Sequence, residues 1–132
     1  MKRAILGAFI TALALKIFFF DFILTEGRSM LPSIKSGRLL LVNKASYGIR
    51  LPLQNAYLVR WAEPKTGDVV VFWTPNGDLA VKRYQPYAET GKFSAIGDNP
   101  GHSYDSRFYG PVPTDNILGR AVGIQPTEIG LK

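Results

Sequence analysis

A serine and a lysine are the side chains in this sequence best suited to nucleophilic chemistry. Ser29 lies in the turn-forming segment Gly27-Arg-Ser-Met-Leu-Pro32, and Lys82 lies in the apolar segment Ala80-Val-Lys-Arg83. Burial among apolar side chains lowers the pKa of an amine from a reference of about 10.4. The neutral amine can then take the proton of a serine hydroxyl and generate a nucleophile. Taken singly, a turn serine and a solvated strand lysine are the simpler interpretations.

A third segment is rich in turn-forming and hydrogen-bonding residues. It runs Gly97-Asp-Asn-Pro-Gly-His-Ser-Tyr-Asp-Ser-Arg107 and follows an apolar stretch. Asp105 and Arg107 are a plausible ion pair, and Ser103 is a plausible hydrogen-bond donor. The segment is either an ordinary surface loop or a structured support for a functional site.

Length and composition restrict the possible functions. The chain has 132 residues, of which 46 % are hydrophobic and 20 % are charged, so we expect one small folded domain. The absence of cysteine excludes disulfides, a thiol nucleophile and cysteine-ligated metal sites. A single histidine, His102, excludes a histidine-cluster metal site. The net charge of +6 allows nucleic acid or anionic lipid as a partner without requiring either.

The elements that must position these residues are short strands. Residues 68–84 predict a hairpin, because two apolar segments flank the turn signal Pro75-Asn-Gly77. Alternation along its second strand places Lys82 on the same face as Ala80 and Tyr84, with Arg83 on the other face. Further strands are predicted at 39–42, 93–96 and 117–124. The spacing favours a mainly β fold, an antiparallel and barrel-like sheet.

The N-terminal segment is the most apolar part of the chain. Residues 4–15 carry no charge, and a helix continued to Leu24 would span about 31 Å. We expect an uncleaved transmembrane helix in residues 1–24, with Lys2 and Arg3 in the cytoplasm and a domain of residues 25–132 outside. A cleaved signal peptide and a buried amphipathic helix are the alternatives. The first lacks a small-residue cleavage site, and the second conflicts with apolar residues on all faces.

Four motifs together resemble type I signal peptidase, the Ser/Lys enzyme that removes signal peptides from exported proteins. They occur in the family's order and reach from about residue 17 to 124. The matching text is Gly27-x-Ser29-Met30-x-Pro32, Gly67-Asp-Val-Val-Val-Phe72, Val81-Lys82-Arg83 and Gly97-Asp-Asn-x-x-x-Ser103-x-Asp105-Ser106-Arg107-x-x-Gly110-x-Val112-Pro113.

The resemblance implies a role for each matching polar residue. Ser29 would be the nucleophile and Lys82 the general base, which is typical of the bacterial branch. Ser103 would help to orient the lysine, and Asp105 and Arg107 would brace the site. The resemblance implies a plasma-membrane enzyme of single-pass topology, without a cofactor or metal, whose partners are signal peptides and the lipid bilayer rather than nucleic acid.

The resemblance also suggests how the substrate would bind. The backbone N–H of Ser29 would donate to the oxyanion, and Gly27 stands where some relatives add a serine hydroxyl. An extended peptide would add as a strand beside residues 25–28 and 79–82, with small side chains of an Ala-x-Ala site in shallow pockets. The residues expected to line those pockets are Met30, Ile34, Ala80 and Val81.

Alternative functions remain open at this point. The small size and the absence of an inserted domain also suit a peptidase dedicated to one substrate, such as a conjugative pilin. An autoprotease of the SOS-repressor type shares the chemistry, but this chain has no DNA-binding region. A nonenzymatic basic β-barrel that binds nucleic acid is the remote alternative, and salt-dependent DNA binding would reveal it.

Overall fold

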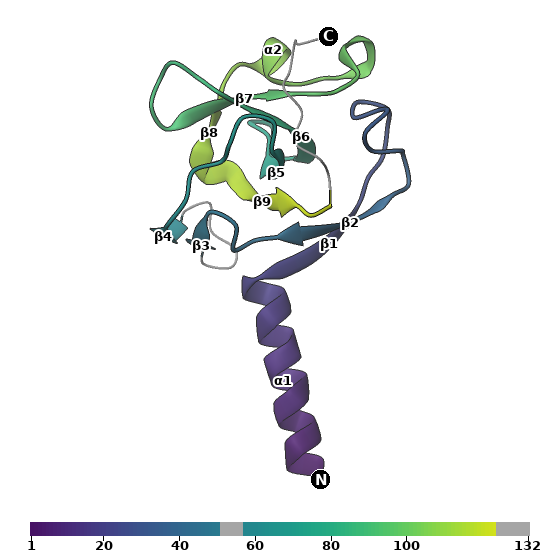
Figure 1. The fold of residues 1–132 in the computed structure, drawn as a ribbon, viewed down its shortest axis with the longest axis vertical. Helices are drawn as coiled ribbons and strands as arrows, with labels where there is room; N and C mark the ends of the chain where they lie inside the picture. The colour runs from purple at the N-terminus through teal and green to yellow at the C-terminus, as the bar shows by residue number, and fades with distance from the viewer. Residues whose placement is uncertain (51–56, 124–132) are drawn as a thin grey trace.

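The protein is an N-terminal helix followed by a curled antiparallel sheet (Figure 1). The computed structural model describes residues 1–50 and 57–123. The elements along the chain are α1 (Lys2–Phe18), β1 (Phe20–Leu24), β2 (Leu39–Asn43), β3 (Gly48–Arg50), β4 (Tyr57–Arg60), β5 (Val69–Trp73), β6 (Leu79–Pro86), β7 (Lys92–Ile96), η1 (Pro100–His102), α2 (Ser106–Tyr109), β8 (Val112–Pro113), η2 (Thr114–Asn116) and β9 (Ile117–Ala121).

The main sheet has seven strands in the order β1-β2-β9-β5-β6-β7-β8, and β3 and β4 form a separate pair. Every pairing is antiparallel. The predicted mainly β, antiparallel fold is confirmed. The predicted hairpin is β5 and β6, with Val70 opposite Lys82 and Trp73 opposite Leu79. The other predicted strands are β2, β7 and β9, and the last predicted strand residue, Ile124, lies outside the described part.

Apolar side chains cover both faces of the central strand β5, which explains its run of consecutive buried residues. One core contains Val70 and Phe72 together with the aromatic rings of Tyr84 and Phe93, which stack at 5.4 Å. The other core contains Val69, and it packs against the turn that carries the serine. Its buried members are Met30, Ile34, Leu40, Val69 and Ala121. The second core therefore fixes the turn against the sheet.

The N-terminal helix differs from the expectation. It ends at Phe18, and the next residues form β1, which pairs with β2 from Phe20 opposite Asn43 to Leu24 opposite Leu39. Aromatic and β-branched residues favour strands, and a partner strand is available here, so the sheet competes successfully with the helix. The predicted transmembrane helix over 1–24 is wrong in this respect. Among the described residues, none of the helices is both long and apolar enough to cross a bilayer.

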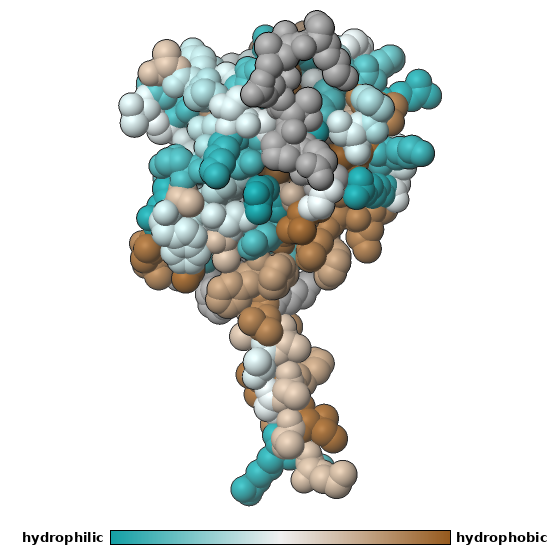
Figure 2. Space-filling view, in the orientation of Figure 1, coloured by the Kyte–Doolittle hydropathy of each residue, from teal (hydrophilic) through white to brown (hydrophobic). Residues whose placement is uncertain are grey.

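The helix α1 projects away from the sheet (Figure 1). Residues 1–15 are exposed throughout, including Ile5, Phe9 and Ile10. Apolar residues lie on all sides of the helix rather than on one stripe. The side chains of β1 continue this surface, because Phe22 and Leu24 are also exposed. Figure 2 shows hydrophobic residues gathered where the helix joins the sheet.

Candidate active site

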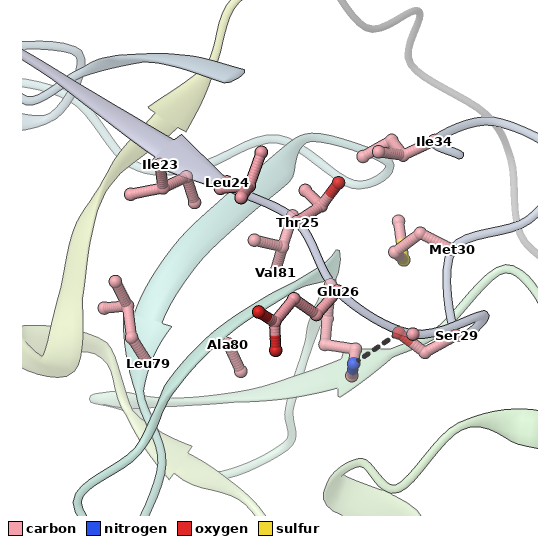
Figure 3. A pocket seen from close by; sticks show the side chains of 12 residues that line it. Ile23, Leu24, Thr25, Glu26, Ser29, Met30, Ile34, Leu79, Ala80 and Val81 are labelled. Atoms are coloured by element: carbon pink, nitrogen blue, oxygen red, sulfur yellow. Dashed lines mark hydrogen bonds between the residues drawn. The ribbon is translucent and has the colours of Figure 1, made fainter. Parts of the chain in front are cut away.

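Ser29 and Lys82 meet at one end of a cleft between the turn after β1 and the strand β6 (Figure 3). The Lys82 Nζ donates a hydrogen bond to the Ser29 Oγ over 2.8 Å. The cleft has a volume of about 290 Å³. Its lining consists of Ile23, Leu24, Thr25, Glu26, Gly27, Ser29, Met30, Ile34, Leu79, Ala80, Val81 and Lys82. All four residues expected to line substrate pockets are therefore present beside the serine and lysine.

The lysine is buried rather than solvated. Lys82 is 7 % exposed, so the interpretation as an ordinary surface lysine is wrong. Burial lowers its pKa from 10.5, and the nearby negative charge of Asp105 opposes part of that shift. Burial is the larger effect, and the net result favours the neutral amine. A neutral amine in contact with a hydroxyl can act as a base toward it.

The turn that carries Ser29 is held from the side opposite Lys82. The Asn99 N–H donates to the Ser29 carbonyl over 2.8 Å, and the Asn99 side-chain amide donates to the Arg28 carbonyl over 2.9 Å. The turn also requires a glycine, because Gly27 has φ +84°. The Gly27 N–H donates to the Ser36 Oγ, so it is already engaged within the turn.

Several hydrogen bonds near the lysine converge on the carboxylate of Asp105. It is fully buried and accepts hydrogen bonds from the Gly97 N–H, the Ser103 hydroxyl and the Arg107 guanidinium. Burial alone raises the pKa of Asp105, but these donors outweigh it and lower the pKa to about 2. The expected ion pair with Arg107 is present at 2.8 Å. The Ser103 hydroxyl donates to Asp105 over 2.7 Å, and its expected role in orienting the lysine stays a prediction.

Sequence reasoning missed a second buried ion pair beside the first. Arg83 is 1 % exposed and donates from Nε and Nη2 to the two carboxylate oxygens of Asp98. The Ser33 hydroxyl donates to the same carboxylate over 2.5 Å. This network joins β6, the loop after β7 and the turn after Ser29. The predicted alternation placed Arg83 only on the face opposite Lys82, and nothing in that local pattern indicated its burial or its acidic partner.

The edge of β6 beside the cleft is available for pairing. β7 pairs with β6 only from Arg83 to Pro86, while β5 pairs with the other edge. Among the described residues, no strand covers the cleft-facing edge of Leu79–Val81. Such an edge accepts an extended peptide by adding one strand to the sheet.

Comparison with known proteins agrees with this arrangement. The model of the family described as "Signal peptidase, peptidase S26" matches residues 1–88 and 81–125. A protein called signal peptidase I from Bacillus caldolyticus is 29 % identical over 80 % of this chain and 79 % of its own length. Signal peptidase I of Pseudomonas aeruginosa is 38 % identical over 77 % of this chain, and that of Pseudomonas fluorescens is 30 % identical over the same share. The chain matches 33 % of the length of each Pseudomonas protein.

Proposed function

This chain belongs to the signal peptidase family, peptidase S26, and we propose that it is a membrane-attached serine endopeptidase that cleaves N-terminal signal peptides from exported proteins. The observation that carries the proposal is the contact between a buried lysine amine and a serine hydroxyl at the end of a cleft whose side chains are mostly apolar. The names of the relatives support the substrate class.

The proposed reaction uses Lys82 as the base and Ser29 as the nucleophile. The neutral Nζ takes the hydroxyl proton while Oγ bonds to the carbonyl carbon of the scissile peptide. The tetrahedral intermediate collapses, the C–N bond breaks, and the leaving amine takes the proton from Lys82. A water molecule, deprotonated by the same amine, then attacks the acyl-serine and releases the signal peptide. The dyad is thus restored with all protons accounted for.

The developing oxyanion needs hydrogen-bond donors near Ser29. The Ser29 N–H is the proposed donor, and within residues 1–50 and 57–123 it has no acceptor in the protein. Because the Gly27 N–H already donates to Ser36, Gly27 contributes the shape of the turn rather than a donor. The second donor is left unassigned.

The cleft suits an extended peptide with small side chains. The free edge of Leu79–Val81 offers main-chain hydrogen bonds, which are independent of substrate sequence. Met30 and Ile34 are buried members of the second core and also line the cleft, so substrate side chains there would meet an apolar surface. These features support recognition of Ala-x-Ala sites through Met30, Ile34, Ala80 and Val81.

We propose that α1 attaches the protein to the lipid bilayer that also holds its substrate. The exposed apolar side chains of α1 favour lipid over water on every side. The exposed Phe22 and Leu24 extend that surface to the edge of the cleft. Confining enzyme and substrate to one layer raises their effective concentration.

The test is mass spectrometry of products from a model preprotein incubated with the detergent-solubilised full chain. We expect one cut after an Ala-x-Ala site, abolished in Ser29→Ala and in Lys82→Met, because neither half of the dyad works alone. Combining the two changes should cause no further loss. Ser46→Ala and Lys65→Met are the matched controls outside the cleft.

The histidine provides a separate check. His102 is exposed and absent from the cleft lining, so His102→Ala should retain activity. A large loss in that variant would point to a histidine base instead. Residual cleavage near the wild-type rate in Ser29→Ala or Lys82→Met would refute the assignment of the dyad.

A further inference from the structure

One carboxylate lies in a cleft whose side chains are mostly apolar. Glu26 lines the cleft three residues before Ser29, and Figure 3 shows its side chain directed toward Ala80. The other lining residues are hydrophobic or small, apart from Thr25 and the Ser29–Lys82 dyad. The reaction proposed above uses Ser29 and Lys82 and needs no carboxylate in the cleft. Glu26 is therefore available for another role.

The carboxylate of Glu26 is not engaged by the described parts of the chain. No ion pair or hydrogen bond joins it to a basic side chain within residues 1–50 and 57–123, although Arg28 is only two residues away. The residue is exposed to solvent in the open cleft. A substrate side chain entering the cleft would thus meet a negative charge that lacks a neutralising partner.

Strand geometry indicates which substrate residue would meet Glu26. Ala80 precedes Lys82 by two residues, which is about 6.6 Å along a strand. A peptide added beside β6 has the same repeat. When the peptide runs parallel to β6 and the residue before the scissile bond lies at the dyad, the third residue before that bond lies near Ala80, with its side chain toward the buried Met30 and Ile34. The second residue before the bond carries its side chain on the opposite, open face, where the exposed Glu26 can meet it.

We propose that Glu26 is a specificity-determining residue that favours a lysine or arginine side chain at the second position before the scissile bond, the position that an Ala-x-Ala site leaves free. The inference rests on the proposed peptidase function and narrows its substrate class. A cationic side chain there gains an ion pair that a neutral one lacks. Because the cleft is open to water, we expect a preference of roughly two- to five-fold in kcat/KM, as for other solvent-exposed pairs.

The experiment compares three matched peptides that differ at one position and share an Ala-x-Ala-type cleavage site. The second residue before the bond is Lys, Gln or Glu, with Ala at the first and third, and the full chain is assayed in detergent. We expect the order Lys above Gln above Glu in kcat/KM. The Lys preference should shrink as salt rises, because ions screen an exposed pair.

Two substitutions at Glu26 test the cause of the preference. Glu26→Gln should bring the ratio of Lys to Gln substrates close to one, and Glu26→Lys should reverse the order so that the Glu peptide is favoured. Glu63→Gln removes an equal charge outside the cleft and should leave the ratio as in the wild type. An unchanged ratio in both Glu26 variants would overturn the proposal.

The outcomes separate this proposal from the peptidase function. Cleavage of all three peptides at equal rates would refute the role of Glu26 and leave the dyad intact. Failure to cleave any of the peptides, or cleavage that persists in Ser29→Ala, would refute the peptidase function itself.

Discussion

The burial of Lys82 has a measurable thermodynamic consequence. Its pKa is lower in the folded protein than the 10.5 of the free side chain, so the unfolded state binds the proton more readily. Stability is therefore lost as pH falls from about 10.5 to the folded pKa, and the loss is complete below it. We expect Lys82→Met to remove this loss. As the pH falls, the free energy of unfolding of the variant should therefore rise relative to that of the wild type. Denaturant unfolding between about pH 7 and pH 10 measures the difference.

The corresponding control is Lys65→Met, because Lys65 is exposed. Its stability curve should run parallel to that of the wild type. Parallel curves for Lys82→Met as well would mean that the amine keeps its solvation in the folded state. The same pKa sets activity: the cleavage rate should rise with pH through the folded pKa of Lys82, since only the neutral amine accepts a proton.

Asp105 gives a prediction of the opposite sign. Its pKa falls from 3.8 to about 2 on folding, so it contributes stability that is present above 3.8 and lost as pH falls toward 2. We expect the free energy of unfolding of Asp105→Asn to be about 2 kcal/mol lower than that of the wild type at pH 7. This difference should become smaller by about pH 3. Chemical denaturation at several pH values measures it, with Asp78→Asn as the control on an exposed loop.

The same variant has a kinetic effect that a purely structural role would not produce. The charge of Asp105 raises the pKa of Lys82, so its removal should move the acid limb of the pH–rate profile to lower pH. An unshifted profile, or a stability gap that stays constant with pH, would contradict the role of Asp105 as an ionised neighbour of the lysine.

At the residue scale, the sequence was sufficient to pair Ser29 with Lys82, because four ordered motifs resemble one family. It was also sufficient for the ion pair of Asp105 with Arg107. It could not predict that the Ser103 hydroxyl donates to Asp105, because a hydroxyl can be donor or acceptor and its partner depends on the folded loop. The charge of Glu26 escaped notice for a related reason, since nothing in its local sequence reveals which side chains line a cleft.

At the scale of elements, the close approach of the loop after β7 to the serine turn is critical. A Cβ added at Gly97 would lie 2.1 Å from the Ser103 Oγ and 2.7 Å from the Ser29 carbonyl oxygen. We expect Gly97→Ala to displace the turn and to lower kcat/KM by at least ~10-fold, because small misplacements of reacting groups reduce rates strongly. Steady-state peptide cleavage measures the effect.

Gly101→Ala is the matched control, because nothing lies within 4 Å of a Cβ added there. It should cleave at the wild-type rate. Wild-type activity in Gly97→Ala would show that the loop and the turn can separate without disturbing the dyad. Circular dichroism of both variants distinguishes a local displacement from loss of the fold.

The hairpin of β5 and β6 followed from the sequence because its two apolar segments and the turn signal between them are local. The end of α1 did not. An apolar run continues through Leu24, and hydropathy alone does not distinguish a helix from an edge strand. What ends the helix at Phe18 is pairing of β1 with β2, whose residues begin at Leu39. Contacts between segments so far apart are not visible in a local pattern.

At the scale of the whole molecule, α1 and the sheet are structurally separate. The helix contacts chiefly β1, and residues 1–15 are exposed. We therefore expect deletion of residues 1–18 to leave the thermal transition of the sheet nearly unchanged. The same deletion should abolish co-sedimentation with lipid vesicles, because the apolar surface of α1 is removed.

Co-sedimentation of the shortened chain at the level of the full chain would place lipid attachment elsewhere, with the exposed side chains of β1 as the next candidate. A large fall in thermal stability would show that α1 supports the sheet. The assay should use vesicles of both neutral and anionic lipid, since the net charge of +6 adds an electrostatic attraction to the second kind.

The direct connection from α1 through β1 to the serine turn fixes the distance between the end of the helix and Ser29. Only ten residues separate the end of the helix at Phe18 from Ser29, and five of them are the extended strand β1. At about 3.3 Å per residue, that strand measures roughly 16 Å. Because β1 is paired along its length, this span has little freedom to lengthen or shorten. Under the proposed peptidase function, the dyad would reach only a bond that lies at this distance from the end of the helix. Position along the substrate as well as its sequence would then decide which bond is cleaved.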